Sequence, residues 1–134
     1  MKASPDKDVV LIVDDDEVGR EALAELVAMD GFVAATAADG VEALEYLRHA
    51  LPPRLIILDL SMPKMDGWQF RAEQQKDSAL AKIPVVVTTA RPSDEASTFD
   101  ADAIFLKPLD VHLFLGVISH YLSIPKTYPG ADLD

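Results

Sequence analysis

Short apolar runs alternate with segments of helical character five times along the chain, and this alternation restricts the fold more than any other feature. The runs are VVLIV from Val9, FVAAT from Phe32, LIIL from Leu55, VVVTT from Val85 and AIFL from Ala103. Because the runs are apolar at nearly every position, they predict strands buried on both faces. Strands of this kind that alternate with helices indicate a parallel sheet covered on both sides. We therefore expect an α/β fold with a doubly wound, five-stranded sheet flanked by helices.

Five helices are expected between and after these strands. Their predicted ranges are Glu17–Met29, Gly40–Ala50, Trp68–Lys76, a short polar helix within Arg91–Asp100, and a last helix capped by Asp110 that ends near Leu122. Together the elements predict one domain over residues 8–123. We expect residues 1–7 to be an N-terminal extension and residues 124–134, with two prolines and a glycine, to be an irregular tail.

Composition excludes several classes of protein. The 134 residues carry a net charge of −11, which argues against direct nucleic-acid binding because such binding depends on basic side chains that neutralise phosphates. There is no cysteine, so disulfides, cysteine-ligated zinc and thiol catalysis are excluded. No apolar run approaches the roughly 20 residues of a membrane span, and the start of the sequence lacks the apolar segment of a signal peptide. We expect a cytoplasmic protein without membrane contact.

Reactive side chains stand where the predicted strands end. Asp14 and Asp15 follow the first strand, Asp59 follows the third, Thr89 ends the fourth and Lys107 follows the fifth. Ligands of parallel sheets bind at the carboxyl ends of the strands, so these side chains are expected to converge. Adjacent carboxylates repel one another unless a cation compensates, and Mg²⁺ prefers oxygen ligands of this kind.

A carboxylate can also act as the nucleophile in phosphoryl transfer and become an aspartyl phosphate. The transferred group carries negative charge, and transfer is fast only where that charge is neutralised. A metal at Asp14 and Asp15 would neutralise part of the charge, and Lys107 the rest. Thr89 is placed to hydrogen-bond a phosphoryl oxygen. This combination predicts phosphorylation of Asp59.

The sequence resembles the receiver domains of two-component response regulators over nearly its whole length, and most closely the single-domain, chemotaxis-regulator type. The resemblance rests on four motifs in order: VVLIVDDDEVGRE, ILDLSMPKMDGWQF, VVVTTA and FLKP. Their spacing also agrees with the family, with 44 residues from Asp15 to Asp59 (59 − 15) and 30 from Asp59 to Thr89 (89 − 59). The resemblance implies the strand order 2-1-3-4-5, the flavodoxin-like order that chemotaxis receivers have.

The resemblance also implies individual roles. Asp59 accepts the phosphoryl group from a sensor histidine kinase or a histidine phosphotransfer protein. Lys107 contacts that group, and Thr89, rather than Thr88, is the switch hydroxyl because it directly precedes Ala90. The bond between Lys107 and Pro108 is expected to be cis.

The same resemblance implies a magnesium site. Its ligands are the carboxylates of Asp14, Asp15 and Asp59 and the backbone carbonyl of Ser61. The chain would then act through conformational change or phosphorelay, and it would be no enzyme beyond its own phosphorylation and dephosphorylation.

Two features depart from the family pattern. Ile104 stands where the family has an aromatic switch residue, and Phe105, one position later, should point to the opposite face of its strand. Thr89 and Lys107 are 18 residues apart (107 − 89), roughly one helical turn fewer than usual. The fourth helix is therefore expected to be short or irregular.

Three other functions are weighed against this one. A phosphatase of the haloacid-dehalogenase type needs a second carboxylate two residues after the nucleophile, where this chain has Ser61. A flavin- or nucleotide-binding module needs a phosphate loop after the first strand, where this chain has acids. The remaining alternative is a pseudo-receiver, which binds partners without using phosphate.

The last helix is apolar around most of its circumference. No Lys, Arg, Asp or Glu occurs from Val111 to Pro125, and the apolar positions cover an arc of roughly 240°, where one-sided packing needs little more than ~100°. We expect Leu113, Val117 and Tyr121 to face the sheet. The residues expected to point outward are Val111, Leu115 and Leu122. The exposed part predicts a homodimer interface, unless the tail Ile124–Tyr128 covers it.

Overall fold

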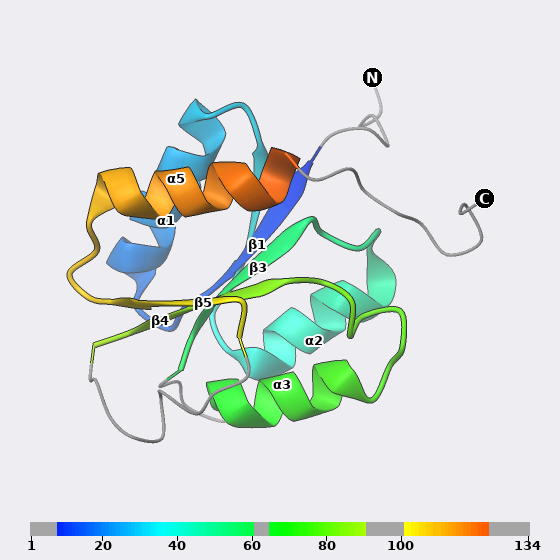
Figure 1. The fold of residues 1–134 in the computed structure, drawn as a ribbon. Coiled ribbons are helices and arrows are strands. Elements are labelled where there is room, and N and C mark those ends of the chain that lie inside the picture. The colour runs from blue at the N-terminus through cyan, green and yellow to red at the C-terminus, as the bar shows by residue number, and fades with distance from the viewer. Residues whose placement is uncertain (1–7, 61–64, 91–100, 124–134) are drawn as a thin grey trace.

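The structure, a computed structural model that describes residues 8–60, 65–90 and 101–123, contains one five-stranded sheet (Figure 1). All neighbouring strands are parallel, and their order is β2-β1-β3-β4-β5. This confirms the predicted fold and strand order. The strands are β1 (Val9–Val13), β2 (Val33–Ala37), β3 (Leu55–Asp59), β4 (Val85–Thr89) and β5 (Ala103–Leu106).

Helices cover both faces of the sheet. Figure 1 shows α1 and α5 on one face and α2 and α3 on the other. The helices are α1 (Glu17–Met29), α2 (Gly40–His49), α3 (Gly67–Gln75) and α5 (Val111–Ser123). The predicted fourth helix, the N-terminal extension and the tail lie outside the described residues. Within the described ranges, no helix is long and apolar enough to cross a membrane.

Two apolar cores hold the helices on the sheet. One lies between the sheet and α2–α3 and includes Phe70, and the other lies under α1 and α5 and includes Phe114; both side chains are fully buried. Strands β3 and β4 are buried at every position. Alternate residues of β1, β3 and β4 enter opposite cores, as the apolar sequence runs predict. The central strands are therefore firmly held, and their carboxyl ends present side chains at fixed positions.

The predicted rotation of α5 about its axis was only partly right: Val117 and Tyr121 pack against the core and Val111 is exposed, as expected, but the other positions differ. Phe114, Ile118 and Leu122 face the sheet and are buried, whereas Leu113 is 58% exposed. Leu115, predicted to point outward, packs partly against the core. Because α5 is apolar around most of its circumference, its periodicity could not select the buried face. In the observed orientation of α5, the ring of Phe114 packs edge to face against the ring of Phe105, with the ring centroids 5.4 Å apart.

Candidate functional site

Three carboxylates meet at the carboxyl ends of β1 and β3. Val13 of β1 is in register with Leu58 of β3, so the next residues, Asp14 and Asp59, are neighbours. Asp14 is 2% exposed and Asp59 6% exposed, while the adjacent Asp15 is open to solvent. One oxygen atom from each of the three carboxylates lies within 4.8 Å of the others. The structure therefore brings together the three predicted carboxylate ligands.

The ammonium group of Lys107 reaches into this cluster. Its Nζ lies 3.1 Å from Oδ2 of Asp14 and 3.9 Å from Oδ2 of Asp59. The backbone N–H of Lys107 donates to the carbonyl of Thr89 over 2.8 Å, which fixes the end of β5 against β4. The peptide bond to Pro108 is cis, as predicted. The ammonium group of Lys107 thus stands beside two buried carboxylates and partly compensates their charge.

The loop after β1 holds Asp14 with contacts that sequence reasoning did not predict. The backbone N–H of Asp16 donates to Oδ1 of Asp14 over 2.9 Å. Arg20, one turn into α1, donates from Nη1 to the backbone carbonyl of Asp14 over 2.7 Å. Arg20 lies shortly after a run of four acids in the sequence, but its spacing alone does not indicate which carbonyl it reaches. These bonds orient the Asp14 carboxylate toward Asp59 and Lys107.

Two adjacent threonines end β4 beside Asp59. Thr88 is in register with Asp59, and both Thr88 and the predicted switch residue Thr89 are buried. The hydroxyl of Thr88 has no hydrogen-bond partner among the residues that the structure describes. Ser61, whose carbonyl was predicted as a metal ligand, lies outside the described residues. The structure thus places hydroxyl groups, carboxylates and an ammonium group at one edge of the sheet.

Gly67 lets α3 begin close to the end of β3. A Cβ atom at Gly67 would lie 3.0 Å from Cα of Leu60 and 3.3 Å from the backbone oxygen of Asp59. The N–H of Gly67 donates to the carbonyl of Leu60 over 3.0 Å, and Asp66 and Gln69 form a reciprocal capping box at the helix start. No larger residue fits at Gly67 without a shift of the backbone. The start of α3 is therefore held directly against Leu60, the residue that follows Asp59.

The donor atoms of this site fit a hard divalent cation such as Mg²⁺. Carboxylate oxygens are its preferred protein ligands, and one or two of them usually suffice alongside water and phosphate oxygens. Asp14 and Asp59 supply buried oxygens, whereas the exposed Asp15 leaves one side open to solvent. Among the described residues, the three carboxylates outnumber the one lysine beside them, and this excess of negative charge also favours a cation. Chemically, the site can bind such a cation and can direct a carboxylate nucleophile at a phosphoryl group.

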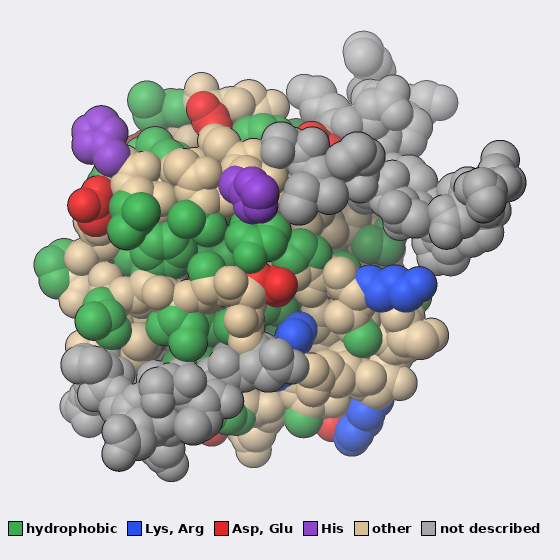
Figure 2. All heavy atoms as spheres, viewed as in Figure 1, with side chains coloured by type: hydrophobic (Ala, Val, Ile, Leu, Met, Phe, Trp, Pro, Cys, Tyr) green, Lys and Arg blue, Asp and Glu red, His purple; other side chains and the backbone are tan. Residues whose placement is uncertain are grey.

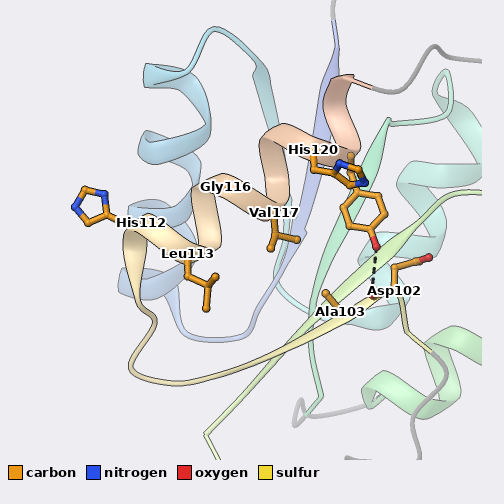
Figure 3. A pocket seen from close by; sticks show the side chains of 8 residues that line it. Asp102, Ala103, His112, Leu113, Gly116, Val117 and His120 are labelled. Atoms are coloured by element: carbon orange, nitrogen blue, oxygen red, sulfur yellow. Dashed lines mark hydrogen bonds between the residues drawn. The ribbon is translucent and has the colours of Figure 1, made fainter.

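A separate hollow of about 420 Å³ lies between α5 and the start of β5. In Figure 3, Leu113 and Val117 point from α5 toward Ala103. The dashed line marks the hydroxyl of Tyr121, which donates to the backbone carbonyl of Asp102 over 3.2 Å. Burial, followed by the charge of the Asp102 carboxylate, raises the pKa of the Tyr121 hydroxyl above its usual range, so it stays protonated and remains a donor.

This hollow belongs to a larger apolar face. Figure 2 shows hydrophobic side chains gathered across the α5–β5 face, with histidine side chains along its upper border. The sequences of α5 and β5 contain no Lys, Arg, Asp or Glu. Its exposed large hydrophobic residues are Ile104, Leu106, Val111 and Leu113, and we call them the α5–β5 patch.

Comparison with known proteins agrees with the fold. The family model described as the response regulator receiver domain matches residues 10–118. Response regulator Rre1 of Synechocystis is 34% identical over 119 residues, which are 85% of this chain and 51% of that protein. The DNA-binding dual master transcriptional regulator RpaA of the same organism is 33% identical over 126 residues, 91% of this chain and 52% of that protein. The chain thus spans about half the length of these relatives.

Solved structures show the same architecture. The signal receiver domain of a histidine kinase from Syntrophus aciditrophicus superposes with a TM-score of 0.82 at 26% identity, and the match covers 94% of this chain and 98% of that one. Chemotaxis protein CheY4 of Vibrio cholerae superposes with a TM-score of 0.78 at 28% identity, over 86% of this chain and 98% of that one. By sequence, strand order and structural similarity, the chain belongs to the response regulator receiver domain family.

Proposed function

We propose that Asp59 accepts a phosphoryl group from a phosphohistidine of a sensor histidine kinase or a histidine phosphotransfer protein. An oxygen of the Asp59 carboxylate forms a bond to phosphorus as the phosphorus–nitrogen bond of the donor breaks. The bonding electron pair stays on the donor imidazole, which leaves. The observation that carries this proposal is the position of Asp59, within 4.8 Å of two further carboxylates and 3.9 Å from the ammonium group of Lys107.

The surrounding residues support this transfer. Asp14, Asp15 and Asp59, with the backbone carbonyl of Ser61, would hold Mg²⁺, which when bound neutralises charge on the phosphoryl oxygens. Lys107 already lies between Asp14 and Asp59 and supplies a second positive charge. Thr89 donates a hydrogen bond to a phosphoryl oxygen. These contacts offset the repulsion between the Asp59 carboxylate and the negatively charged phosphoryl group as the two approach, so they stabilise the transition state and the product.

The phosphorylated chain is proposed to signal by conformational change or to pass the phosphoryl group onward in a relay. It would do so in the cytoplasm, where histidine kinases form phosphohistidine from ATP. Direct contact with nucleic acid is not part of this function, because the chain carries a net charge of −11.

Replacing Lys107 by methionine should slow phosphorylation of Asp59 by acetyl phosphate and Mg²⁺ roughly 100-fold, since one charge that stabilises the transition state is lost. The measurement is the initial rate of phosphoprotein formation. Lys76→Met is the matched control, because Lys76 pairs locally with Glu73 on the surface of α3, and its rate should equal that of wild type.

The pseudo-receiver alternative predicts a different result. A wild-type chain that binds its partners but takes no label from acetyl phosphate, phosphoramidate or a phosphorylated kinase would support that alternative and contradict phosphoryl transfer to Asp59.

The α5–β5 patch is proposed to form a homodimer interface. Ile104, Leu106, Val111 and Leu113 are exposed apolar side chains on elements without charged residues. Two copies with a net charge of −11 each repel one another, and contact through α5 and β5 adds no charge from these two elements to the interface. A twofold axis through this patch would pair it with itself, as symmetric dimers require.

Leu113→Glu should convert a self-associating wild-type chain into a folded monomer, because it places a carboxylate in the centre of the proposed interface. Sedimentation gives the mass and circular dichroism the fold. Leu51→Glu, at a residue that is also exposed but lies outside the patch, should leave the dimer intact. A monomeric wild type, together with aggregation of a chain truncated after Ser123, would instead support coverage by the tail.

A further inference from the structure

Thr88 carries a buried hydroxyl group that phosphoryl transfer, as described above, leaves without a role. The residue is 1% exposed, and its Oγ1 has no hydrogen-bond partner among the described residues. Burying a hydroxyl without a partner disfavours the folded state. The preceding residues of β4, Val85 to Val87, are all fully buried valines, and a valine at position 88 would have nearly the same shape. Thr88 is therefore a polar exception in an apolar strand.

The neighbours of Thr88 in the sheet show which group its hydroxyl can reach. On one side Thr88 is in register with Asp59, and on the other with Phe105. Paired residues of a parallel sheet point to the same face, so the three side chains form a row. Phe105 offers only an aromatic ring, which packs against Phe114. Of the two neighbours of Thr88 in this row, Asp59 is therefore the one whose side chain offers a hydrogen-bond acceptor.

A change of rotamer would be enough to form that bond. Threonine has three staggered χ1 positions, and its hydroxyl hydrogen turns freely to suit an acceptor. Neighbouring strands are about 4.8 Å apart, so a hydroxyl turned toward β3 comes within reach of groups on Asp59. Phosphorylation adds further charged oxygens that extend beyond the Asp59 carboxylate, and each can accept a strong hydrogen bond from a hydroxyl group.

We propose that Thr88 is a second hydroxyl of the phosphorylation site, whose hydrogen bond is missing in the resting chain and is made to the phosphorylated side chain of Asp59. The proposal rests on phosphorylation of Asp59 and adds a residue beyond Thr89. It gives a role to a hydroxyl at a position where valine would be more stable. Thr88 is a positioning residue in this account, because it orders the product and takes no part in bond breaking.

Beryllofluoride with Mg²⁺, a tetrahedral analogue of the phosphoryl group, provides the test. Thr88→Val should raise the melting temperature of the resting chain by about 3–5 °C, because an unpaired hydroxyl is removed. The same variant should bind beryllofluoride about tenfold more weakly, because a hydrogen bond to a charged group is lost. Thr88→Ser keeps the hydroxyl, and its affinity should stay within about twofold of wild type.

The contrary results are distinct. If Thr88→Val shifts the melting temperature equally with and without beryllofluoride, Thr88 has a purely structural role and the proposal is wrong. Equal loss of affinity in Thr88→Ser and Thr88→Val would also contradict it, because shape rather than the hydroxyl would then matter. If wild type does not bind beryllofluoride at all, both this proposal and phosphorylation of Asp59 are overturned.

Discussion

Asp59→Asn is expected to lower the rate of phosphoryl transfer at least about 1,000-fold, to the background of unspecific labelling. An asparagine amide has the shape of the carboxylate but is a much poorer nucleophile. The transfer should be followed with acetyl phosphate and, separately, with a phosphorylated kinase. The two phosphoryl donors differ, so a loss with both of them must come from the acceptor residue. The variant should remain folded, since replacing one of three clustered carboxylates removes like-charge repulsion.

Asp30→Asn is the matched control for this experiment. Asp30 lies at the C-terminal end of α1, which runs away from the carboxyl ends of the strands, and it is exposed. Its labelling should equal that of wild type. Equal labelling of Asp59→Asn and wild type would show that another residue accepts the phosphoryl group.

The second large effect concerns metal binding. The double variant Asp14→Asn, Asp15→Asn should bind Mg²⁺ more than about 100-fold more weakly, because it loses two of the three carboxylates. Substitution of residues that only hydrogen-bond to metal ligands already lowers metal affinity by up to about 100-fold. Calorimetry measures the affinity directly. Trp68, the single tryptophan of the chain, lies in the first turn of α3 beside Gly67 and gives an independent fluorescence signal.

The double variant and wild type should also differ in thermal stability, both without metal and in their response to Mg²⁺. Without metal, the double variant should melt at a higher temperature than wild type, since three carboxylates no longer share the ammonium group of Lys107. With millimolar Mg²⁺, wild type should gain stability and the double variant should not. An Mg²⁺ affinity unchanged by the two substitutions would remove Asp14 and Asp15 from the metal site.

The sequence predicted the fold and the convergence of the site because both follow from short-range patterns. Apolar runs identified the strands, and parallel strands place their carboxyl ends at one edge, so Asp14, Asp59 and Lys107 were expected to meet. The structure confirms that proximity. Boundaries shifted by about one residue: the strand predicted as Phe32–Thr36 is Val33–Ala37.

Side-chain orientation was harder to predict where the sequence pattern does not indicate which way a side chain points. The rotation of α5 was predicted wrongly for Leu113, Leu115 and Leu122, because the apolar arc of this helix is too wide to define one buried face. The bond from Arg20 to the carbonyl of Asp14 depends on how α1 leaves the loop, which residue spacing does not encode. The prediction for Phe105 was more successful: it is buried while Ile104 is exposed, as alternation along a strand requires.

The most direct test of the central claim is to locate the phosphoryl group itself. The wild-type chain is incubated with Mg²⁺ and phosphoramidate, whose phosphorus–nitrogen bond resembles that of phosphohistidine, and the modified residue is identified by mass spectrometry of its peptides. We predict one phosphoryl group per chain, on Asp59, that disappears when the metal is chelated before the donor is added. A phosphoryl group on Asp14, Asp15 or any other residue, with Asp59 unmodified, would contradict the assignment.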